Sequence, residues 1–131
     1  MIYVASRASI PARGAMWRDL RRGGWPINSS WIDEDGPGQT PSMGDLWMRI
    51  GEEIRAATAL VLYAEHEDLP LKGAFIEAGM ALSQGKPVFV VLPNISNPLM
   101  DVGSWLSHPQ VTVVTNLGEA LHRATGRPLY S

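Results

Sequence analysis

The chain contains no cysteine, which excludes disulfide bonds, thiolate nucleophiles and cysteine-bound metals. Its apolar runs are short, and none approaches the roughly 20 residues that span a bilayer, so no membrane is expected as a partner. A net charge of only -2 argues against a nucleic-acid polymer as a partner, because phosphate backbones are bound by basic surfaces. No basic segment precedes a long apolar one at the N-terminus, so we expect no signal peptide and a soluble, cytoplasmic protein.

Motifs for common cofactors are also lacking. No glycine-rich dinucleotide motif follows the first apolar run, and Gly36-Pro37-Gly38 lacks the Lys-Ser/Thr of a P-loop. The three histidines, His66, His108 and His122, lie far apart and show no metal-ligand spacing. We therefore expect no cofactor and no metal ion, and a small molecule is the remaining class of ligand.

Short β-branched runs alternate with helix-length segments along the chain. This alternation is typical of βαβ units around a parallel sheet. For 131 residues it predicts one domain, a flavodoxin-like three-layer α/β sandwich with a five-stranded parallel sheet of order 2-1-3-4-5. Strands are expected at Ile2–Ala5, Ala59–Tyr63, Val88–Leu92 and Val111–Val114, with a weaker one at Pro26–Trp31.

Glycines, prolines and capping residues mark the expected helices. Asn116 with Glu119 three residues later is a capping pattern, and the helix that it opens is expected to end near Gly126. The Gly- and Pro-rich segment Asp33–Ser42 is expected to be a long loop. The remaining helices are expected at about Ala12–Arg22, Met43–Ala57 and Gly73–Gln84, with a short one around Asp101–Leu106.

A single carboxylate, Glu77, interrupts the apolar and small-residue run 71-LKGAFIEAGMALSQGKPVFVV-91. A buried charge without a partner is costly, so Glu77 is exposed, paired or part of a site. It falls near the start of a helix, where the positive end of the helix dipole is expected to keep the carboxylate ionised and nucleophilic. The alternative is an ordinary surface glutamate on an amphipathic helix.

Ligands of such a sheet bind beyond the carboxyl ends of its strands. There the sequence places Ser6 and Arg7, of which Arg7 suits a phosphate, and Trp31, whose ring suits a planar base. Tyr3 is expected to reach the same pocket from the first strand. A plain turn and core aromatics are the alternatives. Asp45, ahead of Glu52 and Glu53 in the same helix, is the candidate acid that protonates a leaving base.

The run 62-LYAEHEDLPLKGAFIEAGMALSQGKPVFVVLP-93 resembles the core motif of the nucleoside 2-deoxyribosyltransferase family. The opening Ile2–Ser6, and Asn97–Met100 with Trp105, are similar to further family segments. The resemblance implies a flavodoxin-like fold, a nucleoside or nucleotide substrate and Glu77 as the nucleophile. The matching residues of the core motif are Gly73, Glu77, Gly79, Ala81, Leu82, Gly85 and Lys86.

Family transferases have an aspartate that binds the sugar 5′-hydroxyl, and related nucleotide hydrolases have a serine for the 5′-phosphate. This sequence has Leu71 and Lys72 at comparable offsets. Asp68 is one candidate for the aspartate role. Lys72, with the backbone amides of the helix that starts at Gly73, is a candidate for holding a phosphate. The family aspartate before the third strand is also replaced, by Thr58.

The resemblance also implies a homo-oligomer in which the Asn97–Trp105 segment of one subunit, with Asn97 and Met100 as site residues, closes the site of a neighbour. The expected function is cleavage or transfer at the N-glycosidic bond of a (2′-deoxy)ribonucleoside, through a covalent glycosyl-enzyme on Glu77. The alternatives are a nucleoside 5′-monophosphate N-glycoside hydrolase and a non-catalytic nucleotide-binding module.

Overall fold

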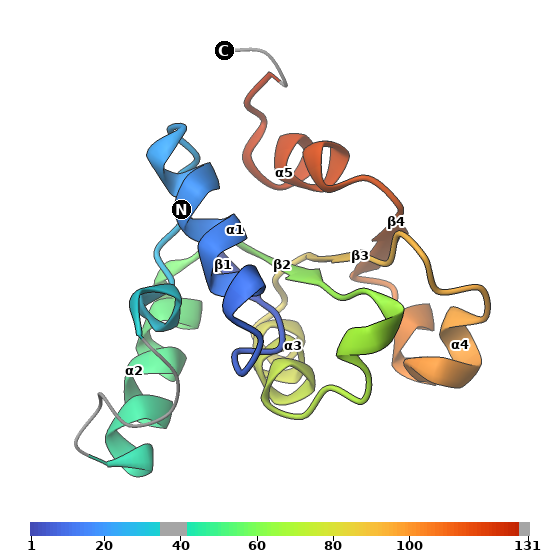
Figure 1. The fold of residues 1–131 in the computed structure, drawn as a ribbon, viewed down its shortest axis with the longest axis horizontal. Coiled ribbons are helices and arrows are strands. Elements are labelled where there is room, and N and C mark those ends of the chain that lie inside the picture. The colour runs from blue at the N-terminus through green and yellow to red at the C-terminus, as the bar shows by residue number, and fades with distance from the viewer. Residues whose placement is uncertain (35–41, 129–131) are drawn as a thin grey trace.

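A computed structural model describes residues 1–34 and 42–128 of the chain. Four parallel strands, paired in chain order, lie between two layers of helices (Figure 1). They are β1 (Ile2–Ala5), β2 (Ala59–Tyr63), β3 (Val88–Val91) and β4 (Val111–Val114). The α/β sandwich is compatible with the expected flavodoxin-like layout. Most of the loop expected at Asp33–Ser42, including Gly36-Pro37-Gly38, lies outside the described residues.

The prediction of a fifth strand is wrong. Within Pro26–Trp31, only Ile27 pairs with the sheet, through a single parallel bridge to Ile2. Two backbone hydrogen bonds make this bridge, from Ile2 N–H to the Pro26 carbonyl (2.8 Å) and from Asn28 N–H to the Ile2 carbonyl (3.0 Å). The predicted strand therefore contributes one residue beside β1, and the sheet has four strands of order 1-2-3-4 instead of five of order 2-1-3-4-5.

Side chains take the place of the missing strand pairing. The Val4 N–H donates to Ser29 Oγ (2.7 Å), and Trp31 Nε1 donates to the Val4 carbonyl (2.7 Å). Because the backbone groups of Val4 are already satisfied, a fifth strand has nothing to pair with at this position. The chain turns instead into the 3-10 helix η1 (Ser30–Asp33).

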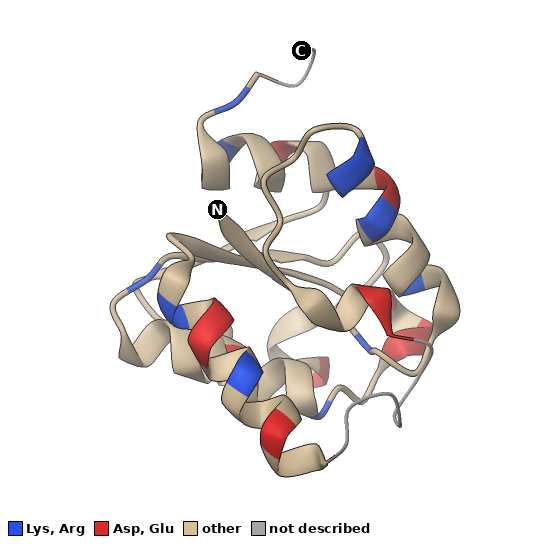
Figure 2. Cartoon of the chain, turned by 90° about the vertical axis from the view of Figure 1, so that its left-hand side faces the viewer, with Lys and Arg blue, Asp and Glu red and all other residues tan. Residues whose placement is uncertain are grey.

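The helices form one layer on each face of the sheet (Figure 1). On one face lie α1 (Pro11–Arg22) and α5 (Leu117–Thr125), and on the other α2 (Met43–Ala56) and α3 (Gly73–Ser83). All four strands lack charged residues, and the Lys, Arg, Asp and Glu residues lie on helices and loops (Figure 2). β1, β2 and β3 are buried on both faces, as is usual in parallel sheets, whereas β4 at the edge is only partly buried and its Val113 is 42% exposed.

The single short helix expected at Asp101–Leu106 is replaced by two pieces. They are α4 (Pro98–Asp101) and the 3-10 helix η3 (Ser104–Ser107). Gly103 separates them with a φ of 133°, a conformation that side chains other than hydrogen rarely allow. Among the described residues, no helix combines the length and apolarity needed to cross a membrane.

Candidate active site

A cleft of about 350 Å³ opens between α2 and α3 at the carboxyl ends of β1 and β2. This is where parallel α/β sheets bind ligands, and the volume is within the roughly 300–1,000 Å³ of small-molecule sites. Its walls come from residues 6–9 after β1, residues 31 and 34, residues 70–72 before α3, one face of α2, and the first turns of α3. The described lining therefore joins segments that are far apart in the sequence.

Glu77 lies in this cleft on the side of α3 that faces the sheet. The residue is 7% exposed, and its helix neighbours on the buried side are alanines. The hydroxyl of Tyr3, a fully buried residue of β1, donates a hydrogen bond to Glu77 Oε1. Glu77 Oε2 lies beside Gly73, 3.6 Å from where a Cβ atom would stand there. Tyr3, Gly73 and Glu77, three of the predicted site residues, are thus in one place.

Burial raises the pKa of Glu77 to about 7, while the hydrogen bond from Tyr3 acts in the opposite direction and the charge of Glu53 adds to the rise. Burial therefore outweighs the helix dipole that was expected to keep the carboxylate ionised. Burial and the nearby Glu77 also raise the pKa of Tyr3, so its hydroxyl stays a proton donor. At neutral pH, Glu77 populates both protonation states, which suits a nucleophile or a proton carrier.

Of the two other acidic candidates on α2, Glu53 lies outside the cleft lining, but its charge acts on both Tyr3 and Glu77. Its carboxylate accepts hydrogen bonds from Ser30 N–H (3.1 Å) and Ser30 Oγ (2.6 Å). Glu52 points away and pairs with Arg55 on the exposed side of the helix (3.2 Å). Glu53 thus acts on the site through its charge rather than by contact.

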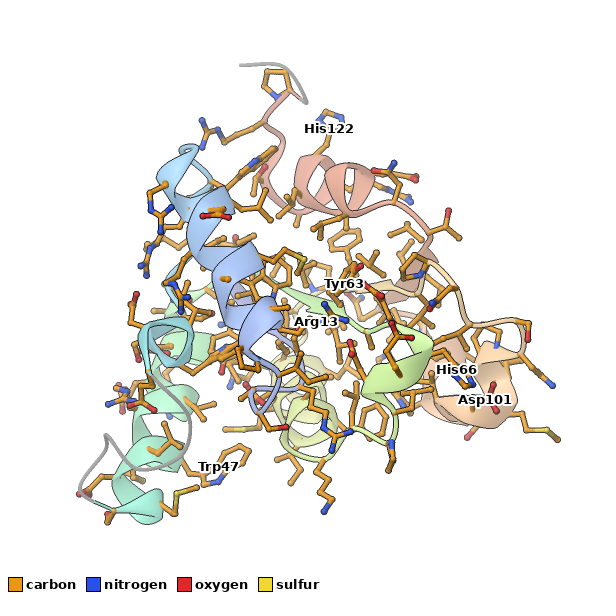
Figure 3. All side chains as sticks on the ribbon, viewed as in Figure 1. Arg13, Trp47, Tyr63, His66, Asp101 and His122 are labelled. Atoms are coloured by element: carbon orange, nitrogen blue, oxygen red, sulfur yellow. The ribbon has the colours of Figure 1, made fainter. Side chains whose placement is uncertain are left out.

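Two tryptophans supply aromatic walls. Trp31, a predicted site residue, lines the cleft and is fixed by its hydrogen bond to the Val4 carbonyl. Trp47 projects from α2 towards α3 (Figure 3), and its ring is 3.5 Å from the Cβ position of Gly73. Trp47 was not predicted from the sequence. Its signal was the helical spacing of the apolar face of α2, which also brings Met43, Leu46 and Ile50 into the lining.

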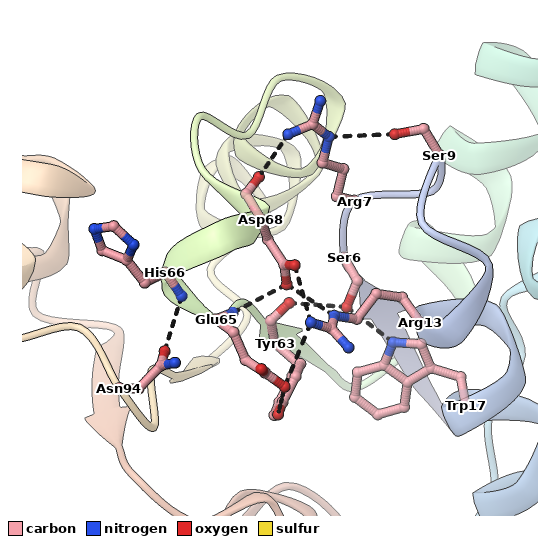
Figure 4. Close-up of polar contacts among 10 residues, drawn as sticks. All are labelled: Ser6, Arg7, Ser9, Arg13, Trp17, Tyr63, Glu65, His66, Asp68 and Asn94. Carbon is pink, nitrogen blue, oxygen red and sulfur yellow. Dashed lines mark hydrogen bonds and ion pairs between the residues drawn. The ribbon is translucent and has the colours of Figure 1, made fainter.

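Two cationic side chains, Arg7 and Lys72, line the cleft, as does the carboxylate residue Glu34. Arg7 Nε donates to Ser9 Oγ (3.2 Å), and its Nη1 donates to the backbone carbonyl of Asp68 (3.2 Å) (Figure 4). The exposed Lys72 stands at the start of α3 and also lines the cleft. The two cationic groups, both predicted, form hydrogen-bond donors suited to an anion.

Ser6 lines the cleft as predicted, but its hydroxyl also has a role in the fold. Oγ donates to the Tyr63 carbonyl (2.9 Å) and accepts from Trp17 Nε1 (3.0 Å). The loop after β1 is therefore tied both to β2 and to α1.

Five predicted site residues lie outside the cleft lining, and of these only Tyr3 contacts Glu77. The Asp68 carboxylate is fully buried and accepts two hydrogen bonds from Arg13 (2.8 and 2.9 Å). Asp45 is exposed in the first turn of α2, where its backbone N–H is capped by Ser42. Asn97 and Met100 are exposed at α4 and contact each other, with Asn97 Nδ2 3.7 Å from Met100 Sδ.

Lys86, the last residue of the motif that starts at Gly73, has a structural role. Its Nζ donates to the backbone carbonyls of Ile54 (2.5 Å) and Arg55 (2.6 Å), in the last turn of α2. A cation at this position satisfies carbonyls that the helix leaves without partners and complements the helix dipole. This part of the motif is thus explained by packing.

No family model and no curated protein matches this sequence. In the part of the chain that the structure describes, no three His, Asp or Glu residues are grouped so that they could hold a metal ion. The chemistry of the site therefore has to be argued from Glu77, Tyr3 and the lining of the cleft.

Proposed function

We propose that this protein is an enzyme that cleaves or transfers at the N-glycosidic bond of a nucleoside or nucleotide, with Glu77 as the nucleophile. The observation that carries the proposal is the placement of Glu77. It is buried in a small-molecule-sized cleft, bonded to a tyrosine hydroxyl, and its pKa is raised to about 7. A titratable group with such a pKa in a cleft is typical of an active site.

The proposed chemistry needs only the ionised form of Glu77. A carboxylate oxygen bonds to C1′ of the sugar while the bond from C1′ to the base nitrogen breaks, and the base leaves with the electron pair and takes up a proton. The product is a glycosyl ester of Glu77. Water, or a nitrogen of a second base, then bonds to C1′, loses a proton and releases the carboxylate. The hydrogen bond from the Tyr3 hydroxyl favours the ionised form of Glu77, which attacks in the first step. The same bond stabilises the carboxylate that is released in the second step.

The walls of the cleft suit a planar base beside the sugar. Trp31 and Trp47 present aromatic rings from two different segments, and Trp47 lies next to Gly73 at the start of α3. Aromatic faces bind planar rings by stacking, at a gain of roughly 1 kcal/mol beyond area burial. The absence of a side chain at Gly73 leaves room between this ring and the Glu77 carboxylate.

Within this proposal, a nucleoside 5′-monophosphate is the favoured substrate and hydrolysis the favoured reaction. The carboxylate that might bind a 5′-hydroxyl, Asp68, is bound to Arg13 and lies outside the lining of the cleft. Arg7, Ser9 and Lys72 instead place cationic and hydroxyl groups at the mouth. Such groups match a phosphate rather than a neutral hydroxyl.

We also propose that the protein works as a homo-oligomer. Leu99 and Met100 are exposed apolar residues at α4, 57% and 79% accessible, and lie outside the cleft lining of their own chain. Through the family resemblance, Asn97 and Met100 would complete the cleft of a neighbouring copy. Analytical ultracentrifugation tests this directly. If the wild-type protein sediments as a monomer at the assay concentration, the proposal of a site shared between subunits is wrong.

The decisive experiment is a chromatographic assay. The protein is incubated with deoxynucleosides and their 5′-monophosphates, with and without a second free base, beside Glu77→Gln. Free base released without an acceptor indicates hydrolysis, whereas a new nucleoside formed only with an acceptor indicates transfer. Either activity should fall by at least about a thousandfold in Glu77→Gln, because the nucleophile is removed. Full activity in that variant would exclude the proposed mechanism.

The competing proposal from another class is a nucleotide-binding module without turnover. It predicts that wild-type protein releases no base from any nucleotide, yet binds nucleoside monophosphates, and that Glu77→Gln binds them equally well. Calorimetric titration of both proteins separates the two proposals.

A further inference from the structure

A buried ion pair lies beside the cleft without lining it. Asp68, in the 3-10 helix η2 (His66–Asp68), is fully buried, and Arg13 of α1 is 9% exposed. Arg13 Nε and Nη2 donate to the two carboxylate oxygens of Asp68 at 2.8 and 2.9 Å, which is a bidentate arrangement. The hydrogen bonds that Arg13 donates to Asp68 raise the pKa of Arg13, so the guanidinium stays charged.

The pair fixes the shape of the loop that follows β2. Asp68 also accepts from the Glu65 N–H (3.0 Å), closing a capping box across η2. Glu65 Oε2 in turn lies 3.4 Å from Arg13 Nη2 and accepts a hydrogen bond from the Tyr63 hydroxyl at 2.5 Å. The guanidinium of Arg13 also lies 5.3 Å from the centroid of the Tyr63 ring. The start of α1 and the loop before α3 are thus bound into one rigid unit.

Arg7 is attached to the same unit. Its Nη1 donates to the backbone carbonyl of Asp68 at 3.2 Å, and its Nε donates to Ser9 Oγ (Figure 4). Asp68, whose carboxylate binds Arg13, therefore also orients the Arg7 side chain at the mouth of the cleft. A guanidinium held in advance loses less freedom when it binds an anion, which improves affinity without a new contact.

A stability role alone is a weak explanation for this pair. Buried ion pairs often contribute no more to stability than apolar residues of similar volume, because both charges lose their hydration. What an apolar pair cannot supply is the fixed geometry of a bidentate guanidinium–carboxylate contact.

We propose that Arg13 and Asp68 are positioning residues, which lock the loop after β1 to the loop after β2 and so hold Arg7 ready for the anionic group of a ligand in the cleft. This inference rests on the proposed function for the nature of the ligand. It assigns Asp68 an indirect part in binding, in place of direct contact with the substrate.

The test is a double-mutant cycle in which NMR titration measures the binding of inorganic phosphate to each variant. Arg7→Ala and Asp68→Asn should each raise the dissociation constant for phosphate about tenfold, and the two together no more than about twofold further, because both act through the same guanidinium. Asp19→Asn is the matched control, since Asp19 pairs with Arg22 on the exposed side of α1 (2.7 Å) and should leave binding unchanged. An unchanged constant in Asp68→Asn, or an equal loss in the Arg7→Ala background, would overturn the proposal.

Loss of folding is separated from loss of positioning by a second variant. The double variant Arg13→Met with Asp68→Leu replaces both charged residues with apolar residues. The midpoint of its unfolding transition should therefore be close to that of the wild type. The double variant should nevertheless show the same weakened phosphate binding as Asp68→Asn. If it folds and binds phosphate as the wild type does, the pair does not position Arg7.

A readout without ligand keeps this inference distinct from the proposed function. The Nη1–H resonance of Arg7, whose donor bonds to the Asp68 carbonyl, should be separately observed and protected from exchange in the wild type, and averaged in Asp68→Asn. If the wild type binds neither phosphate nor nucleotides but shows this difference, the proposed substrate is wrong and the positioning role stands. If the resonance is the same in both proteins, the positioning role fails whatever the protein binds.

Discussion

The hydroxyl of Tyr3 donates a hydrogen bond to Oε1 of Glu77, although 74 positions separate the two residues in the chain. β1 supplies the tyrosine, and α3 supplies the glutamate. Because both residues are buried, each sets the proton affinity of the other.

Replacement of Tyr3 by phenylalanine should raise the pKa of Glu77 above its value of about 7. The lost hydrogen bond favours the ionised carboxylate, and a bond of this kind to a charged group is worth roughly 1.5–3 kcal/mol, or about one to two pH units. A ¹³C-NMR titration of the Glu77 carboxyl measures the shift directly. Tyr63→Phe is the control, because its hydroxyl bonds to Glu65 outside the cleft. The same titration curve in Tyr3→Phe and wild type would contradict the prediction.

Glu77→Gln should gain stability relative to the wild type as the pH rises. The pKa of Glu77 is raised from 4.5 to about 7 on folding, so the folded state binds the proton more tightly. Wild-type stability is therefore full below pH 4.5 and falls between pH 4.5 and 7, by about 3 kcal/mol, whereas glutamine does not titrate. Urea unfolding at pH 4 and pH 8 measures the difference between the two proteins. Glu119→Gln, on the exposed side of α5, should track the wild type at both values.

Gly73→Ala should fold normally and lose activity. A Cβ atom there would lie 3.5 Å from the Trp47 ring and 3.6 Å from Glu77 Oε2, which are ordinary contact distances. The unfolding free energy should change by less than about 1 kcal/mol, while the added methyl group obstructs the space beside the carboxylate and lowers kcat/KM by about tenfold or more. Gly79→Ala, on the exposed side of the same helix with nothing within 4 Å, is the control for both measurements.

Lys86→Met should lower stability and spare activity. The variant removes the two hydrogen bonds to the Ile54 and Arg55 carbonyls and the favourable charge at the end of α2. The expected loss in unfolding free energy is about 1 kcal/mol. Thermal unfolding and the chromatographic assay measure the two effects, with the exposed Arg22→Met as a control. A selective loss of activity at unchanged stability would assign Lys86 to the site.

The strands were predicted from the sequence because charge-free apolar runs in a parallel sheet have few other environments available. The loss of the fifth strand was not predicted, because the outcome depends on two hydrogen bonds between the backbone of Val4 and the side chains of Ser29 and Trp31. Periodicity describes how apolar residues recur along a chain and carries no information about such individual bonds.

Within the candidate site, Glu77 was found because a lone carboxylate in an apolar run is conspicuous. The environment of Asp68 was not foreseen, because its partner Arg13 is 55 positions away. Trp47 was overlooked for a related reason, since an aromatic residue on an amphipathic helix gives the same pattern whether it faces a core or a cleft. Contacts between segments far apart in the chain decide both cases, and only the folded chain shows them.

The hydrogen bonds of Ser29 and Trp31 to Val4 also affect how copies of the chain meet. An open strand edge is a template on which another chain can add a strand, and long unpaired edges promote aggregation. On β1, the bridge at Ile27 and these two side chains occupy the edge. Replacing Ser29 and Trp31 would expose unpaired backbone groups on the edge of β1, beside the cleft. These two side chains therefore protect that edge from strand addition by other copies of the chain and from fibrous assembly.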